Sequence, residues 1–173
     1  SIKELRGIGI QPDLLICRSQ SRLTETVKDK ISLFCDIPKD GIIEIRDVDS
    51  IYEVPIVLEE QKLGDLLLDR LKLPTKKPDL QQWREMVYRL KHPEKQITIG
   101  VIGKYVRSKD AYMSINEALI HAGSYHKCKI EIKRIDADFL LKNDVKQLLK
   151  GINGVLIPGG FGIRGIEGKI KTI

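Results

Sequence analysis

The chain has 173 residues, of which 42% are hydrophobic and 31% are charged, and this composition is typical of a soluble globular protein. No apolar run approaches the roughly 20 residues of a membrane span, so we expect no membrane partner. The formal net charge is +6, but Lys and Arg are interleaved with Asp and Glu along the chain, which argues against a nucleic-acid partner and leaves small anions such as phosphates.

The first 71 residues alternate between patterns typical of strands and patterns typical of helices. Thr24 is positioned to cap a helix, and the apolar strand that precedes it is expected to be buried on both faces. The predicted elements are a helix over 1–9, a strand over 12–17, a helix over 24–34, a strand over 42–46 and a helix over about 57–71. This alternation predicts a parallel sheet.

A proline-containing break follows this first half. The segment from Leu73 to Pro78 holds two prolines and adjacent charges, so it cannot continue the preceding helix. Another amphipathic helix is predicted over 80–92, with Trp83, Val87 and Leu90 on one face. We therefore expect one domain over 1–71, an interdomain linker with a helix over 72–95, and a second domain over 96–173.

The second domain again has the pattern of an α/β protein. The residues near 129–135 alternate at period two, which indicates a strand with one face in solvent. Gly151 is placed to end the helix before the last strand. The predicted elements are a strand over 97–103, a helix over 110–122, a strand over 129–135, a helix over 138–150, a strand over 154–158 and the start of a helix over 168–173.

Residues 158–165, here called the glycine turn, carry four glycines after the last predicted strand. Backbone N–H groups in such a turn suit an anion, either as an oxyanion hole or as a phosphate site. The segment from Gly160 to Gly165 also satisfies the G-x-G-x-x-G dinucleotide pattern, but that pattern normally follows the first strand of its unit. A turn that needs glycine only for its backbone geometry is the third alternative.

The cysteines and histidines indicate no catalytic group. Cys17, Cys35 and Cys128 form no C-x-x-C pair and stand in apolar surroundings, so we expect buried, reduced thiols. The chain starts without Met and without a signal-peptide pattern, which predicts a piece of a longer cytoplasmic protein. The histidines, expected at the surface, are His92, His121 and His126.

The glycine turn and its flanks resemble those of one enzyme family. Residues 156–169 are similar to the glycine loop in the class I glutaminase domain of CTP synthases. Residues 100–105, 110–112 and 117–119 resemble the start of that domain. Residues 1–55 resemble the end of the family's amidoligase domain, with the most similar segments at 9–13, 16–19 and 47–52.

The resemblance implies a fold, a reaction and a set of ligands. The fold would be α/β: the end of a parallel-sheet, P-loop-like amidoligase domain, a linker, and the first half of a Rossmann-like class I glutamine amidotransferase domain. CTP synthases aminate UTP to CTP with ATP and with ammonia from glutamine. The ligands implied are ATP, UTP, glutamine, Mg²⁺ and the effector GTP, and the assembly implied is a homotetramer.

The resemblance also assigns residues by position in this sequence. Gly159 and Gly160 would form part of the oxyanion hole, with Gly160 also contacting glutamine. Lys30 would contact UTP or CTP, and Phe161 and Arg164 would lie in a GTP effector region. The residues implied in ATP binding are Arg18, Arg46, Asp47 and Val48.

The resemblance places the remaining machinery outside these residues. The family's P-loop and magnesium carboxylates would precede Ser1, and its catalytic Cys, His and Glu would follow Ile173, so no metal ligand and no nucleophile is expected in this chain. The chain alone is therefore predicted to be inactive. The alternative to a ligase fragment is a nucleotide-binding α/β module without catalysis.

Overall fold

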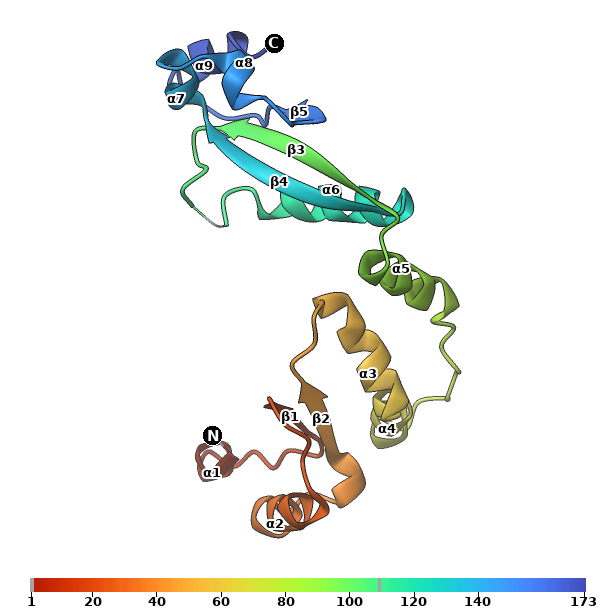
Figure 1. The fold of residues 1–173 in the computed structure, drawn as a ribbon. Coiled ribbons are helices and arrows are strands. Elements are labelled where there is room, and N and C mark those ends of the chain that lie inside the picture. The colour runs from red at the N-terminus through yellow and green to blue at the C-terminus, as the bar shows by residue number, and fades with distance from the viewer. Residues whose placement is uncertain (1, 109) are drawn as a thin grey trace. The chain divides into compact units, whose positions relative to one another are not determined.

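The computed structural model of the chain describes residues 2–108 and 110–173, so Ser1 of the first predicted helix lies outside it. The chain divides into two compact units, one ending at Arg84 and one running from Glu85 to Ile173. Each unit contains parallel strands flanked by helices, so the expected α/β class is confirmed (Figure 1). The predicted limits of the two domains and of the linker at 72–95 stay a prediction.

The first unit is built around two parallel strands, paired from Leu15 opposite Ile42 to Ser19 opposite Arg46. Thr24 caps α2 as expected, its side chain accepting a hydrogen bond from the Val27 N–H at 3.3 Å. The elements are α1 (Ile2–Gly7), β1 (Leu15–Ser19), α2 (Glu25–Cys35), η1 (Lys39–Gly41), β2 (Ile42–Arg46), η2 (Ile51–Glu53), α3 (Val54–Glu60) and α4 (Leu63–Arg70). Helix α5 (Gln81–Lys91) spans the division between the units.

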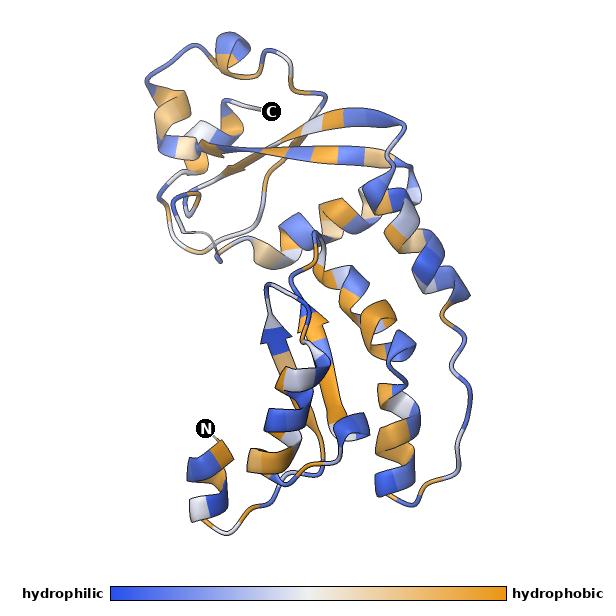
Figure 2. Ribbon diagram, turned by 60° about the horizontal axis from the view of Figure 1, so that its bottom comes forward, coloured by the Kyte–Doolittle hydropathy of each residue, from blue (hydrophilic) through white to orange (hydrophobic). Residues whose placement is uncertain are grey.

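The burial predicted for the first strand is wrong. Ile16 in β1 is 50% exposed, and Phe34 on the apolar side of α2 is 74% exposed. The strand β2 is largely orange in Figure 2, and its Ile42 and Ile43 are buried. The reason is that the sheet of the described first unit has only two strands, so β1 has a single neighbour and too little apolar surface to cover it.

The single helix predicted over about 57–71 is also wrong, because it is broken between α3 and α4. Lys62 adopts a left-handed backbone conformation with φ 57°. Just before it, the Gln61 amide binds the edge of β2: its Oε1 accepts from the Glu44 N–H at 2.8 Å, and its Nε2 donates to the Glu44 carbonyl at 2.6 Å. Apolar periodicity continues through this point and therefore does not reveal the tertiary bond that bends the chain.

The second unit has a three-stranded parallel sheet in the order β4-β3-β5. Its core cluster joins the strands to a helix through Ile102, Ile135, Ala137 and Leu140. The elements are β3 (Lys95–Gly103), α6 (Met113–Tyr125), β4 (Cys128–Asp136), α7 (Ala137–Leu141), α8 (Val145–Leu148), β5 (Gly154–Leu156) and α9 (Ile166–Ile170). The alternating exposure predicted for the second strand of this unit is confirmed in β4.

The helix predicted over 138–150 is wrong as a single element, because α7 and α8 are separate. The Asp144 side chain accepts a hydrogen bond from the Lys146 N–H at 3.0 Å and thereby caps a new helix. Gly151 has φ 78°, as expected for a residue that ends a helix. No helix within residues 2–108 and 110–173 combines the length and the hydrophobicity that a bilayer crossing requires.

The strand order of the second unit brings two loops together. Because β3 is the central strand and pairs in parallel with β5, the residues that follow both strands lie at the same edge of the sheet. Lys104 comes directly after β3, and only Ile157 separates β5 from the glycine turn. The carboxyl edge of this sheet is therefore where the candidate site is built.

Candidate functional site

The glycine turn is exposed from Gly159 to Arg164 and buried at its two ends, Pro158 and Gly165. Pro158 is buried, whereas Gly159 and Gly160 are exposed. Within the described part of the chain, the N–H groups of these two glycines donate to no protein acceptor. Gly162 and Gly165 have φ of 78° and 81°, a left-handed conformation that residues with a side chain adopt only at a cost, so the turn needs glycine there.

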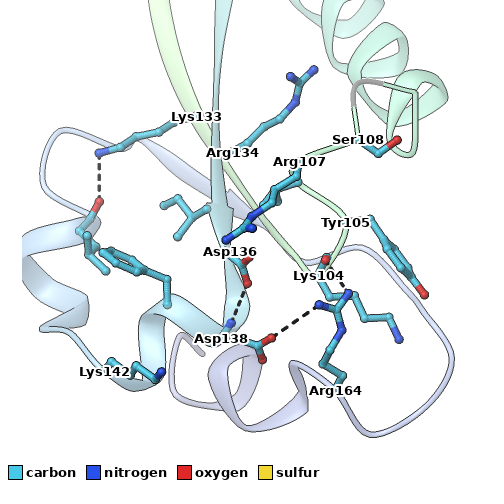
Figure 3. Close-up of a pocket in the computed structure, with 14 residues that line it drawn as sticks. Lys104, Tyr105, Arg107, Ser108, Lys133, Arg134, Asp136, Asp138, Lys142 and Arg164 are labelled. Atoms are coloured by element: carbon cyan, nitrogen blue, oxygen red, sulfur yellow. Dashed lines mark hydrogen bonds and ion pairs between the residues drawn. The ribbon is translucent and has the colours of Figure 1, made fainter.

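Lys104 fixes the glycine turn from the neighbouring strand. Its side chain belongs to a residue that is only 8% exposed, and its Nζ donates to the Phe161 carbonyl. The Lys104 carbonyl in turn accepts from Arg164 Nη2 at 2.8 Å, and Arg164 Nη1 lies 3.8 Å from Asp138 Oδ2. Figure 3 shows the Arg164 guanidinium between Lys104 and Asp138.

A cavity of about 820 Å³ opens at the ends of β3 and β4. Arg164 and Lys104 are in its wall, whereas the neighbouring Phe161 is 94% exposed and is not a lining residue. Positive charge exceeds negative charge around it, since six cationic side chains face two aspartates. These residues are Lys104, Arg107, Lys133, Arg134, Lys142 and Arg164, with Asp136 and Asp138 (Figure 3).

A smaller cavity of about 300 Å³ lies in the first unit, at the carboxyl ends of β1 and β2. Asp47 Oδ1 lies 3.1 Å from both Arg18 Nε and Arg18 Nη2, so these two side chains form a charged wall. Most of the other lining residues are apolar and include Ile51 and Val54. All four residues that the resemblance implies in ATP binding line this cavity, namely Arg18, Arg46, Asp47 and Val48.

Comparison with known proteins covers the whole chain. Residues 1–73 match the family described as the CTP synthase N-terminus, and residues 108–173 match the class I glutamine amidotransferases. A CTP synthase of Caldanaerobacter subterraneus subsp. tengcongensis is 50% identical over 173 residues, which are 100% of this chain and 32% of the relative. A CTP synthase of Methanocaldococcus jannaschii is 48% identical over 179 aligned positions, 100% of this chain and 33% of the relative.

Over its whole length the chain is similar to CTP synthases, and it matches the CTP synthase N-terminus and the class I amidotransferases in that order. It spans about a third of the length of the CTP synthases that it matches. The match confirms the resemblance seen around the glycine turn. It also confirms the expected fold, in which a CTP synthase N-terminal domain is followed by a class I amidotransferase domain.

Lys30, expected at UTP or CTP in a CTP synthase, is not among the residues that line the cavity of about 300 Å³. It is exposed on α2. A second cavity of about 310 Å³ in this unit is lined instead by Lys28 together with Arg22, Arg46 and Glu44. The role of Lys30 stays a prediction, as do the roles of the other residues assigned by resemblance.

The cysteines do not occupy a nucleophile's position in the CTP synthase fold seen here. Cys17 lies within β1, Cys35 ends α2, and Cys128 begins β4, so none is on a strand-to-helix elbow. Burial is the largest cause that raises the pKa of the Cys17 thiol, and electrostatic repulsion from Cys35 and Glu44 raises it further. The raised pKa lowers the fraction of Cys17 present as thiolate. All three thiols are free, but the prediction that they are buried holds only for Cys128, because Cys17 and Cys35 are partly exposed.

The three histidines are exposed, as expected. His92 stacks on the Tyr88 ring, with 4.3 Å between the ring centroids. In residues 2–108 and 110–173, no three His, Cys, Asp or Glu side chains come together in a way that could hold a metal ion. Mg²⁺, which the CTP synthase family implies, therefore gains no complete ligand set from the described residues.

Sequence reasoning missed the partners of the glycine turn. Lys104, Lys169 and Asp138 were assigned no role, yet Lys104 and Lys169 bind backbone carbonyls of the turn and Asp138 pairs with Arg164. One signal was available for Lys104, since a residue directly after a strand lies at the ligand-binding edge of a parallel sheet. The order of the strands places this edge beside the turn, and local sequence patterns do not predict that order.

Proposed function

We propose that this chain is part of an enzyme that aminates UTP to CTP, using ATP and ammonia released from glutamine. The observation that carries the proposal is the similarity of the whole chain to CTP synthases at 50% identity. The two family matches occur in the order in which a synthetase domain precedes a glutaminase domain. Pyrimidine nucleotide synthesis in the cytoplasm and assembly as a homotetramer belong to the same proposal.

In the glutaminase half-reaction, Gly159 and Gly160 supply backbone N–H groups to an oxyanion hole. A nucleophile from outside these 173 residues attacks the side-chain amide of glutamine, and negative charge develops on the amide oxygen. Fixed N–H donors stabilise that charge more than they stabilise the ground state. The exposed and unpaired N–H groups of both glycines support this role, as does their position at the carboxyl edge of the sheet.

In the synthetase half-reaction, the cavity at the ends of β1 and β2 holds part of ATP. Arg18 suits a phosphate because its guanidinium offers several donors in one plane, and Asp47 holds that plane in place. The apolar lining by Ile51 and Val54 suits a base or a ribose edge. Lys30 contacts UTP or CTP in this proposal, and Mg²⁺, when bound, would neutralise phosphate charge.

GTP regulation is assigned to the neighbourhood of Phe161 and Arg164. The excess of cationic side chains in the cavity beside Arg164 supports an anionic effector there. Phe161 offers an exposed ring on which a base could stack.

The alternative, a nucleotide-binding module without catalysis, finds little support. Its dinucleotide motif, from Gly160 to Gly165, would place phosphate against the start of α9, which has only five residues. The motif also follows β5, the third strand of its unit along the chain. We therefore retain the proposal that the chain is part of a glutamine-dependent ligase.

The proposal is tested with the full-length protein that contains this chain. Supplied with UTP, ATP, Mg²⁺ and glutamine, it should form CTP, and ammonia should replace glutamine. Product can be separated and measured by liquid chromatography. Absence of CTP with both nitrogen sources would rule out the assignment.

Arg18→Met should weaken ATP binding. Loss of one charge-assisted hydrogen-bonding group should raise the KM for ATP about tenfold or more, since such bonds contribute about 1.5–3 kcal/mol. The measurement is ammonia-dependent CTP formation as a function of ATP concentration. Arg22→Met is the matched control, because Arg22 lines the other cavity of the unit. Equal effects of both substitutions would show a general loss of charge and not a role of Arg18.

A further inference from the structure

The two exposed glycines lie between two backbone carbonyls that are each bound by a lysine. Lys169 Nζ donates to the Pro158 carbonyl at 2.7 Å, and Lys104 Nζ donates to the Phe161 carbonyl. The two lysines come from different elements, since Lys104 follows β3 and Lys169 lies in α9. We call this pair the lysine bracket, because it holds the glycine turn on both sides of Gly159 and Gly160.

Because a peptide group is planar, a hydrogen bond that fixes its C=O also fixes the direction of its N–H. In a trans peptide the C=O and N–H bonds point in opposite directions, and no cis peptide occurs among the described residues. The Pro158 carbonyl shares a peptide with the Gly159 N–H, and the Phe161 carbonyl shares one with the Gly162 N–H. A lysine that draws either carbonyl toward itself therefore turns the N–H of the same peptide away from it.

The Lys104 side chain is itself fixed by hydrogen bonds and packing, so it can hold the Phe161 carbonyl in one direction. Its backbone carbonyl is bound by Arg164, and its ammonium is bound by Phe161. Its aliphatic stem runs beside Gly160, where an added Cβ would lie 3.3 Å from Lys104 Cε. A buried ammonium needs hydrogen-bond acceptors, and the turn provides one, so the lysine and the turn stabilise each other.

We propose that Lys104 and Lys169 are positioning residues for the oxyanion formed during glutamine hydrolysis: Lys169 orients the Gly159 N–H, and Lys104 holds the Phe161–Gly162 peptide and so fixes the turn on the other side of Gly160. The inference rests on the proposed function. Both lysines act through peptide planes, because their ammonium groups bind carbonyl oxygens of the turn. Donors that are fixed before the reaction give the largest stabilisation of developing charge, so the bracket affects rate more than substrate binding.

Lys104→Met and Lys169→Met in the full-length protein test the bracket, because methionine keeps an apolar stem and removes the ammonium. Each should lower kcat for glutamine-dependent CTP formation about tenfold with little change in KM for glutamine, since a small misplacement of catalytic donors has effects of this order. Ammonia-dependent formation should stay unchanged. An equal loss with both nitrogen sources, or no loss with glutamine, would overturn the proposal.

Lys171→Met is the matched control. Lys171 also lies at the end of α9 and also binds backbone carbonyls, with Nζ 3.2 Å from the Leu140 oxygen, but none of its acceptors is in the glycine turn. It should leave the ratio of glutamine-dependent to ammonia-dependent activity unchanged. Lys169→Arg, which restores a donor, should recover most of the lost rate.

A second readout does not depend on catalysis. Chymotrypsin cleaves after phenylalanine, and the Phe161 carbonyl at that scissile bond is the one that Lys104 binds. Lys104→Met should therefore speed cleavage after Phe161 about tenfold relative to Lys171→Met, because local opening of the turn becomes easier. If no variant, including the unaltered protein, makes CTP, the proposed function fails, and the cleavage rates alone decide whether the bracket holds the turn.

Discussion

Gly160→Pro should reduce glutamine-dependent CTP formation about 10²–10³-fold, because proline has no N–H and the loss of one oxyanion donor costs about 2.7–4 kcal/mol. The backbone before it is also a glycine, which can adopt the extended conformation that precedes proline. Ammonia-dependent formation should be retained, since that reaction bypasses glutamine hydrolysis. The measurement is kcat/KM for each nitrogen source in the full-length protein.

Gly160→Ala separates the lost donor from the added atoms. It places a Cβ in the same position, 3.3 Å from Lys104 Cε, but keeps the N–H. The far end of a lysine side chain can shift by a few tenths of an ångström, so we expect a much smaller effect than with proline. Equal losses for the two variants would indicate that space, and not the N–H group, matters at Gly160.

Gly168→Ala should strongly destabilise the second unit. Gly168 in α9 is buried, and a Cβ there would overlap the backbone of Ala137, the fully buried first residue of α7. Backbone cannot move aside as a side chain can, so we expect a loss of about 3 kcal/mol in the free energy of unfolding, at the upper end of overpacking effects. Urea unfolding followed by circular dichroism measures it.

Gly64→Ala provides the matched control for that substitution. Gly64 is also a helical glycine, in α4, and the nearest atom to an added Cβ is a Glu59 carboxylate oxygen at 3.9 Å. Alanine there should stabilise by about 0.5–1 kcal/mol through its helix propensity alone. If Gly168→Ala behaved like Gly64→Ala, the close packing of α9 on α7 would be wrong.

Most elements could be predicted from local patterns, and the failures have identifiable causes. The strand from Ile42 to Arg46 was predicted with its observed limits, and the N-cap at Thr24 was predicted with its hydrogen bond. The breaks at Lys62 and Asp144 were missed. The first depends on a side-chain bond from Gln61 to a strand distant in sequence, and the second on a polar cap inside an otherwise apolar pattern.

The candidate site was predicted in part, and the part that could be predicted has a local signature. Gly159 and Gly160 are recognisable because glycines that follow an apolar strand are a local signal. The clustering of Arg18 with Asp47 came from a resemblance, and the structure places both in the wall of one cavity. Phe161 and Arg164 are neighbours in sequence but differ in environment, since only Arg164 lines the large cavity.

The sequence by itself determined the α/β class, the similarity to CTP synthases and the glycine turn, because strand and helix periods and glycine content are local properties of the chain. The tertiary structure decided what surrounds the turn. Lys104 and Gly160 are more than 50 residues apart, and they meet because β5 pairs in parallel with the central strand β3. Strand order depends on long-range pairing, and that pairing brings Lys104 to the glycine turn, whereas Lys169 is only 11 residues from the residue whose carbonyl it binds.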